Sequence, residues 1–163
     1  PRLREEVGVI LERLGEDPRR PVERDSPFRM LDRAAIARLR ESGLVALGAH
    51  THHHSILAGL PAEEQRREIE RSLREVEAFT GEPCRLFAYP NGRPEDYDRR
   101  TVELLKEQGI QIAVTTIGGP NTPATPPLEL RRYGIGATHS QAYFELLTHH
   151  ATAWLSANAG GRG

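Results

Sequence analysis

The chain has 163 residues, of which 37% are hydrophobic, and this describes one domain with enough apolar material for a buried core. A formal net charge of −1 gives no electrostatic reason to expect nucleic acid or an anionic membrane as a partner. The single cysteine, Cys84, excludes an intrachain disulfide and a thiolate metal cage, and we expect it to be a small buried residue. No stretch reaches the roughly 18 apolar residues of a membrane span, and the N-terminus has no signal-peptide pattern.

Strands and helices alternate along most of the chain, which is typical of a parallel α/β sheet or barrel. In chain order we expect a helix over residues 3–14, a loop or linker over 16–29, a helix over 32–42, a strand over 44–49, a helix over 61–80, a strand over 85–89, a helix over 98–108, a strand over 110–116, a long loop over 118–127, a strand over 128–135 and a helix over 141–155.

These elements suggest three parts of the chain. We assign residues 1–29 to an N-terminal helix and linker, 30–156 to the main domain and 157–163 to a disordered tail. Because the first residue is Pro1 and not Met, we expect the chain to be a fragment or a processed product.

The strand over 44–49 is apolar throughout, so we expect both of its faces to be covered, and it ends in a cluster of histidines. α/β folds place their chemistry at the carboxyl ends of such strands, and neutral imidazole is the commonest protein ligand for metal ions. The spacing favours His50 with His54 as metal ligands over His50 with His53, and two of His52, His53 and His54 must face elsewhere. The alternative is a purely structural cluster of histidines.

A second informative stretch follows the strand over 85–89, where the chain turns at Pro90, Asn91 and Gly92. Backbone N–H groups that leave a strand in this way have no ladder partner, and they are the donors that an oxyanion hole uses. From this tripeptide alone an ordinary turn is the favoured interpretation.

The longest helix, over 61–80, has Pro61 in its first turn and Gly81 just past its end. Arginine and glutamate residues fill the positions between its apolar residues. We expect them to form a solvated, ion-paired face without a functional role.

Several segments recur together in one known family. They are the run from Gly48 to Leu57, the helix start Leu60-Pro61-Ala62-Glu63-Glu64, the run from Phe87 to Gly92, Gly109, and the run from Ala113 to Thr116. In this order and at these distances they resemble the polysaccharide deacetylases of the NodB homology type, carbohydrate esterase family 4, over roughly residues 30–135.

The resemblance implies a distorted (β/α) barrel and a divalent metal, often zinc. It also implies an enzyme that removes acetyl groups from N-acetylated or O-acetylated polysaccharides, acting on carbon–nitrogen bonds other than peptide bonds. The residues it assigns are as follows: His50 and His54 as metal ligands, Thr51 as a brace of their loop, Asn91 as the backbone donor to the oxyanion, Tyr89 in substrate binding and His139 as the general acid.

The chain departs from the family pattern on its N-terminal side, before His50. The Thr-Phe-Asp-Asp-Gly motif that supplies a catalytic base and a third metal ligand has no counterpart before His50, and Asp25 and Asp32 are isolated. Asp96 and Asp98 follow the Pro-Asn-Gly turn, but carboxylates at helix starts are more often caps. We therefore assign no base, and we expect the barrel to be incomplete on its N-terminal side.

Two hypotheses follow for function. In the first, the chain is most of a metal-dependent deacetylase that lacks its N-terminal strands and is inactive alone. In the second, it is a non-catalytic relative that binds a metal or a glycan. In both, the expected partner is an acetylated polysaccharide or oligosaccharide, and apolar surface exposed by the missing strands could drive self-association. Full-length relatives are often secreted or part of the cell envelope, but this sequence leaves the location open.

Overall fold

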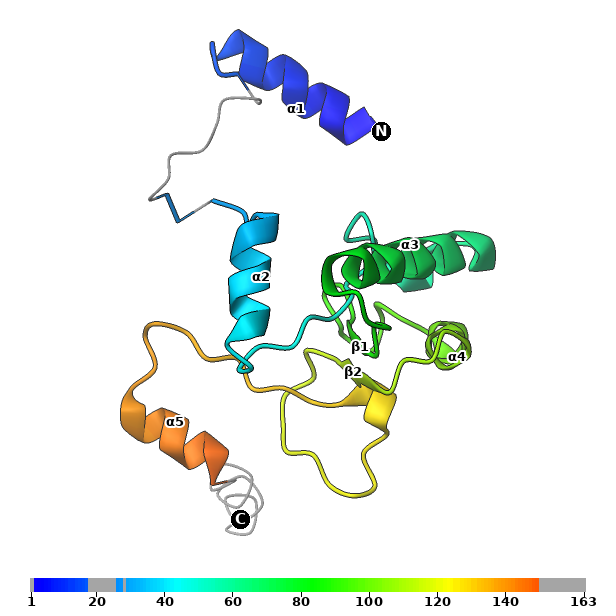
Figure 1. Ribbon diagram of the computed structural model, residues 1–163, viewed down its shortest axis with the longest axis vertical. Coiled ribbons are helices and arrows are strands. Elements are labelled where there is room, and N and C mark those ends of the chain that lie inside the picture. Colours follow the sequence, from blue (N-terminus) through cyan, green and yellow to red (C-terminus); the bar gives the residue numbers. More distant parts are fainter. Residues whose placement is uncertain (1, 18–25, 28, 150–163) are drawn as a thin grey trace, which may run out of the picture. The chain divides into compact units, whose positions relative to one another are not determined.

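The computed structural model describes residues 2–17, 26–27 and 29–149, and Figure 1 labels its helices and strands. It divides the chain into two compact units, Pro1–Leu44 and Val45–Gly163. The tail predicted over 157–163 and the end of the last predicted helix lie outside the described residues.

In its described residues the first unit has two helices, α1 (Arg2–Arg13) and α2 (Arg33–Glu41), which agree with the helical periodicity of the sequence. Asp32 caps α2, because its carboxylate accepts a hydrogen bond from the backbone N–H of Ala35 at 2.8 Å. No residue of α2 is buried. Asp32 thus has a local structural role, as its isolated position in the sequence suggested.

The second unit is built on a small parallel sheet. Strand β1 (Leu86–Ala88) pairs with β2 (Ile112–Val114), with Phe87 opposite Ala113. Single parallel bridges extend the sheet by one residue at each edge, from Ala49 to Phe87 and from Val114 to Leu130. The predicted α/β class with parallel strands is therefore confirmed.

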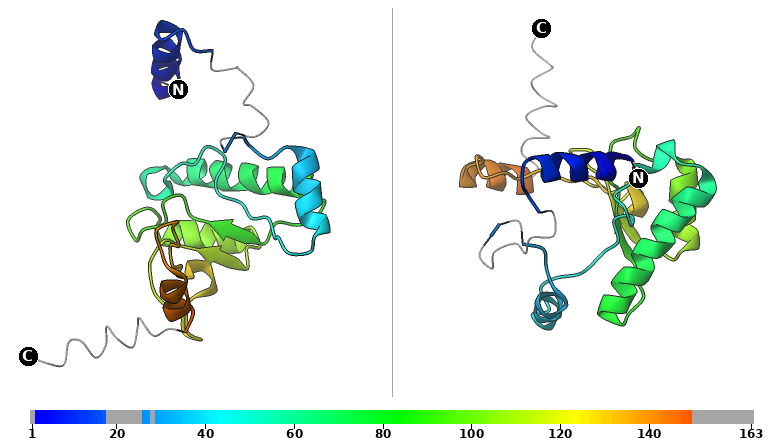
Figure 2. Two further views of the ribbon diagram at one scale, coloured as in Figure 1. Left: turned by 90° about the vertical axis from the view of Figure 1, so that its left-hand side faces the viewer. Right: turned by 90° about the horizontal axis from the view of Figure 1, so that it is seen from above.

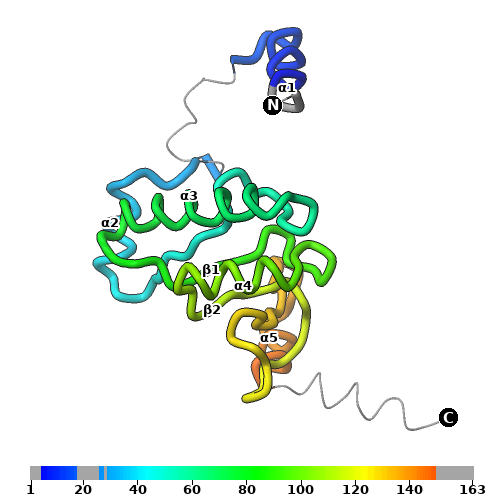
Figure 3. Tube along the Cα trace, turned by 90° about the vertical axis from the view of Figure 1, so that its right-hand side faces the viewer, coloured from blue at the N-terminus to red at the C-terminus, as the bar shows by residue number. Residues whose placement is uncertain are grey.

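Helices α3 (Ala62–Thr80) and α4 (Arg99–Glu107) make the crossovers between these parallel segments and lie side by side (Figures 1 and 3). Figure 2 shows the same arrangement from two further sides. The contact between the helices includes a buried hydrogen bond from the hydroxyl of Thr101 to Oε1 of Gln65, at 2.9 Å. A buried polar pair of this kind fixes how one helix sits along the other.

The core lies between these helices and the strands. Its buried members are Ala49, Leu57, Ile69, Leu73, Cys84, Phe87, Tyr89, Tyr97, Leu104, Leu105, Ile110, Ala113 and Leu128. Only alternate strand residues take part: Phe87 and Ala113 are buried, but Ile112 is 41% exposed. Within the described residues one face of the sheet is covered, which corrects the expectation that both faces would be.

Two predicted strands are reduced to single bridges. Over residues 44–49 only Ala49 makes a bridge, and Leu44 is 90% exposed. This segment pairs with β1 on one side, and among the described residues nothing pairs with its other side, so its apolar side chains are not enclosed. The strand predicted over 128–135 is replaced by a 3₁₀ turn, η2 (Pro127–Glu129), and a bridge at Leu130, because prolines at its start cannot donate ladder hydrogen bonds.

The remaining elements are short. A 3₁₀ turn, η1 (Leu57–Gly59), leads into α3, and α5 (Gln141–Thr148) follows the cap residue Ser140. Among the described helices, none is long and apolar enough to cross a membrane. Self-association through the open face of the sheet stays a prediction.

The start of α4 offers a test of the fold. Asp98 accepts a hydrogen bond from the backbone N–H of Thr101 at 2.8 Å, and the Thr101 hydroxyl completes a capping box, so the capping interpretation of Asp98 is confirmed. Burial acts to raise the pKa of Asp98, but the hydrogen bonds from Thr101 outweigh it and hold this pKa below its ordinary value of 3.8.

We expect Asp98→Ala to lower the free energy of unfolding by about 1 kcal/mol at pH 7. Because the folded-state pKa is depressed, the stabilisation is present above the unfolded-state pKa and is lost as the pH falls through the folded-state pKa. Urea unfolding followed by circular dichroism at neutral and acidic pH measures this, with Asp98→Asn as a control that keeps an acceptor. An equal loss at both pH values would contradict the role of the ionised carboxylate.

Candidate metal centre

The histidine cluster and the Pro-Asn-Gly turn lie at the same edge of the sheet. Ala49 and Phe87 form a parallel bridge, so the segments that follow them leave the sheet in the same direction. The ring nitrogen Nδ1 of His50 lies 2.7 Å from the carbonyl oxygen of Ala88, the last residue of β1. The two stretches that stood out in the sequence are therefore in direct contact.

His50 is held at two points. Its backbone N–H donates to the hydroxyl oxygen of Ser72 on α3 at 3.1 Å, and its Nδ1 pairs with the carbonyl of Ala88. A carbonyl can only accept, so Nδ1 carries a proton, and in the neutral ring Nε2 then keeps its lone pair. This is the tautomer in which an imidazole binds a metal through Nε2.

His54 comes back to His50 through a tight loop. The two rings lie edge to face, with centroids 4.8 Å apart and an interplanar angle of 76°. The loop reaches this shape with positive φ at Thr51 (56°) and His54 (58°). Such backbone conformations cost on the order of 1–3 kcal/mol each in residues other than glycine, so the surroundings must hold the loop in place.

The other two histidines turn toward α3. Nδ1 of His53 lies 2.6 Å from Oε1 of Glu68, and Nδ1 of His52 lies 3.1 Å from Oε1 of Glu75, although this second pair lacks the geometry of a hydrogen bond. His52 and His53 therefore face elsewhere, as the geometric argument from the sequence required.

Thr51 is 8% exposed, and its hydroxyl has no hydrogen-bond partner among the described residues. A buried hydroxyl without a partner is uncommon, and here it sits beside the two converging imidazoles. The role of Thr51 as a brace of the loop stays a prediction.

The turn after β1 is tight. The N–H of Gly92 donates to the carbonyl of Pro90 at 2.6 Å, and Asn91 between them has a φ of 55°. This is the pattern of a three-residue γ-turn, and asparagine tolerates positive φ better than most residues. Asn91 is exposed, and its N–H has no acceptor among the described residues, as an oxyanion donor requires.

Tyr89 lies beneath this turn. Its side chain is 1% exposed, its hydroxyl donates to the carbonyl of Leu128 at 2.8 Å, and its ring stacks on Tyr97 with centroids 4.1 Å apart. The structure gives this side chain a packing role that supports the turn, and its predicted contact with substrate stays a prediction.

His139 lies in the turn before α5. Its Nδ1 accepts a hydrogen bond from the N–H of Gly136 at 3.0 Å, and its ring contacts Tyr143. No hydrogen bond or ring contact described in the structure joins it to His50 or His54. Its role as the general acid stays a prediction.

A divalent metal that favours nitrogen ligands fits the two converging imidazoles by donor type, and it fits His50 by tautomer as well. Across the described ranges, no group of three or more His, Cys, Asp or Glu side chains is placed to hold a metal ion. Asp98 caps α4, and Asp96 accepts a hydrogen bond from the N–H of Arg93 at 2.8 Å, so the two aspartates that follow the Pro-Asn-Gly turn have structural roles. The described residues thus offer two candidate ligands, and no base is evident among them.

Reasoning from the sequence missed two residues that contact the histidine cluster, Glu68 and Ser72. Glu68 is one of the glutamates to which we gave no functional role, and Ser72 was not singled out, yet both contact the histidine cluster. The prediction of a solvated face holds for Arg67 and Arg71, whose side chains are exposed, but not for Glu68, which is 14% exposed. Their spacing of four residues, on a helix that directly follows the histidines, was the available signal.

Comparisons with known proteins identify the family to which the chain is similar. A family model described as polysaccharide deacetylase matches residues 20–113, more than half of the chain. A search of curated proteins found no match.

Three solved structures are similar. A deacetylase of Streptococcus pyogenes, PplD, determined in complex with acetate, is 21% identical over 75% of this chain and 52% of its own, with a TM-score of 0.67. A polysaccharide deacetylase of Bacillus cereus, BC0361, is 24% identical over 86% of this chain and 46% of its own, with a TM-score of 0.64. IcaB from Ammonifex degensii is 19% identical over 88% of this chain and 66% of its own, with a TM-score of 0.62. The chain shares their fold and spans between about half and two thirds of their lengths.

The turn at Asn91 depends on the glycine that follows it. Gly92 has a φ of 76°, and a Cβ added there would lie 2.9 Å from the backbone nitrogen of Thr116. Gly109 has nearly the same φ, 77°, but an added Cβ would meet nothing within 4 Å.

We expect Gly92→Ala to lower the free energy of unfolding by on the order of 1–3 kcal/mol, and by more than Gly109→Ala, because only Gly92 combines positive φ with a close backbone contact. Denaturant unfolding of the two variants side by side measures the difference. Equal losses would show that the contact with Thr116 does not constrain the turn.

Proposed function

The chain belongs to the polysaccharide deacetylase family, and on that premise we propose that it carries part of the active site of a metal-dependent hydrolase. The hydrolase removes acetyl groups from an N-acetylated or O-acetylated polysaccharide. Its parallel strands belong to a distorted (β/α) barrel, of which the described residues supply a part. The observation that carries the proposal is the convergence of His50 and His54 beside the turn at Asn91.

The histidines would hold a divalent metal, and zinc is the expected ion because imidazole is among its preferred ligands. When bound, such an ion polarises the acetyl carbonyl and lowers the pKa of a water molecule. His50 contributes Nε2, since its Nδ1 is used by the carbonyl of Ala88. The hydrogen bond from Nδ1 to the carbonyl of Ala88 also fixes the orientation of the ring.

The turn after β1 supplies a hydrogen-bond donor for the oxyanion. The free N–H of Asn91 is suited to donate to the negative charge that develops on the acetyl oxygen during hydrolysis. Tyr89 supports the turn from below through its stack on Tyr97 and its bond to Leu128. His139 is the proposed donor of a proton to the leaving amine or hydroxyl of the sugar.

Support for an acetylated substrate comes from the similar deacetylase of Streptococcus pyogenes, which was solved with acetate, the product of deacetylation. The alternative function, a non-catalytic relative that binds a metal or a glycan, is favoured by one specific observation. Within the described residues, no third ligand or free carboxylate joins the two histidines. Binding and turnover therefore need separate tests.

For binding, we expect the chain to take up about one zinc ion, and His50→Ala or His54→Ala to abolish uptake because each removes one of two protein ligands. His52→Ala should retain it, since that ring faces Glu75. Isothermal titration calorimetry with zinc measures all four proteins. Equal loss in the three variants would reject the assignment of ligands.

For turnover, we expect no acetate release from a chitin oligomer or an acetylated glucan when this chain alone is incubated with zinc. General base catalysis typically contributes about 10²–10⁴-fold, and the two aspartates that follow the Pro-Asn-Gly turn, Asp96 and Asp98, are engaged in local structure. An enzymatic acetate assay, with His50→Ala as the background control, provides the measurement. Clear release above that control would reveal a base within the chain.

A further inference from the structure

Helix α3 presents a row of polar side chains to the histidine loop, defined as residues 50–55. Glu68, Ser72 and Glu75 are spaced by four and three residues, so they lie on one face of the helix. Each approaches a different histidine of the loop, at distances between 2.6 and 3.1 Å. The loop is thus aligned along the helix at several points.

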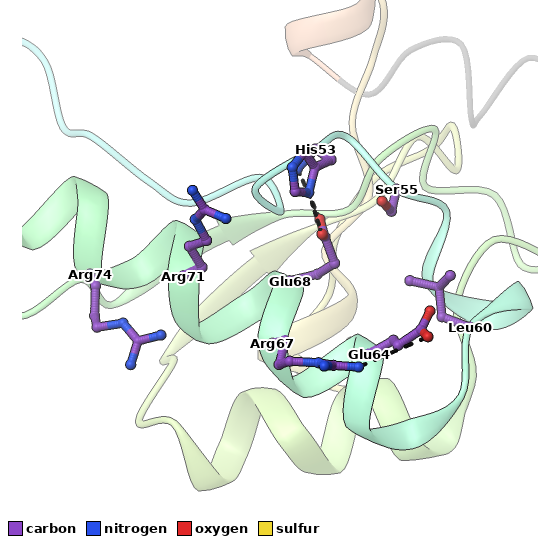
Figure 4. Close-up of a pocket in the computed structure, with 8 residues that line it drawn as sticks. All are labelled: His53, Ser55, Leu60, Glu64, Arg67, Glu68, Arg71 and Arg74. Atoms are coloured by element: carbon purple, nitrogen blue, oxygen red, sulfur yellow. Dashed lines mark hydrogen bonds and ion pairs between the residues drawn. The ribbon is translucent and has the colours of Figure 1, made fainter. Parts of the chain in front are cut away.

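Glu68 makes the strongest of these contacts. One carboxylate oxygen accepts from the backbone N–H of His53 at 2.9 Å, and the other pairs with Nδ1 of the same residue at 2.6 Å. Figure 4 shows Glu68 pointing from α3 to His53, at the side of an open groove of about 400 Å³. Burial acts to raise the pKa of Glu68, but the hydrogen bonds from His53 outweigh it and lower this pKa, so the carboxylate is ionised at neutral pH.

Ser72 holds the other end of the loop. Its side chain is buried, with 6% of the residue exposed, and its hydroxyl oxygen accepts the backbone N–H of His50. His50 is the first residue past the bridge at Ala49, so this bond sets the direction in which the loop leaves the sheet.

The backbone around these two anchors is strained: Thr51 lies between them, and His54 directly follows the second. Thr51 and His54 both have positive φ, a conformation that is uncommon in residues other than glycine and most unusual for a β-branched residue such as Thr51. The acceptors on Glu68 and Ser72 are fixed by a regular helix, and the hydrogen bonds that the backbone N–H groups of the loop donate to them can offset that strain. Without them, the loop could relax to ordinary φ values, and the ring of His54 would move away from His50.

We propose that Glu68 and Ser72 are positioning residues for the metal site: they fix His53 and His50 so that the rings of His50 and His54 converge before a metal arrives. This inference rests on the proposed function, because it assigns a purpose to the convergence of those rings. Neither Glu68 nor Ser72 is itself a ligand.

The test compares Glu68→Ala and Ser72→Ala with Glu64→Ala as a matched control. Glu64 also lies on α3 and lines the same groove, but its carboxylate points toward Arg67, 3.9 Å away, and not toward the loop (Figure 4). Zinc affinity is measured by calorimetry, and cobalt(II) serves as a spectroscopic probe of the same ligands. Hydrogen exchange of the His50 and His53 amides reports on the loop without metal.

We expect Glu68→Ala and Ser72→Ala to weaken zinc binding by about 10–100-fold, as is typical when a group that orients a ligand is removed. Their cobalt spectra should change, and the amides of His53 and His50 respectively should lose protection, while the exchange of core amides in α3 stays native. Glu68→Gln keeps one acceptor oxygen and should restore part of the affinity. Glu64→Ala should match the native chain in every measurement.

The outcomes separate the two proposals. If the native chain binds neither zinc nor cobalt, the proposed function fails, and the amide exchange of the metal-free variants still tests the positioning roles. If the native chain binds zinc and Glu68→Ala binds it equally well, or if the His53 amide keeps its protection in that variant, the positioning role of Glu68 is overturned.

Discussion

The structure of the second unit depends on the parallel pairing of Ala49 with Phe87. Two backbone hydrogen bonds, from the N–H of Ala49 to the carbonyl of Leu86 and from the N–H of Ala88 to the carbonyl of Ala49, are both 2.9 Å long. They place the start of the histidine loop beside the end of β1, and the ring of His50 then reaches the carbonyl of Ala88. A shift of this pairing by one residue would turn His50 to the other face of the sheet.

The parts of the fold that could be predicted were those set by local rules. Helix α3 ends where Gly81 adopts a φ of 71°, and α4 begins at the cap Asp98, because glycine and aspartate make these positions favourable on their own. The pairing of His50 with His54 was also accessible, since their separation and the strand end before them constrain the geometry. The family could be identified from the same residues.

What could not be predicted depended on neighbours distant in the sequence. The apolar run before His50 has the composition of a buried strand, but composition does not reveal how many partners a strand has, and only Ala49 is paired. The contacts of Glu68 and Ser72 with the loop depend on how α3 is rotated about its axis. In a helix rich in arginine and glutamate, the four-residue spacing of Glu68 and Ser72 was the only sign that these two side chains share one face, and it does not show which way that face turns.

The stacked tyrosines beneath the Asn91 turn have an electrostatic consequence. Burial raises the pKa of Tyr97 to about 12, with a further contribution from its hydrogen bond to Glu129, and burial raises the pKa of Tyr89 as well. Both phenols therefore remain neutral throughout the range in which imidazoles gain and lose protons. These two rings therefore pack against the turn without adding a charge of their own.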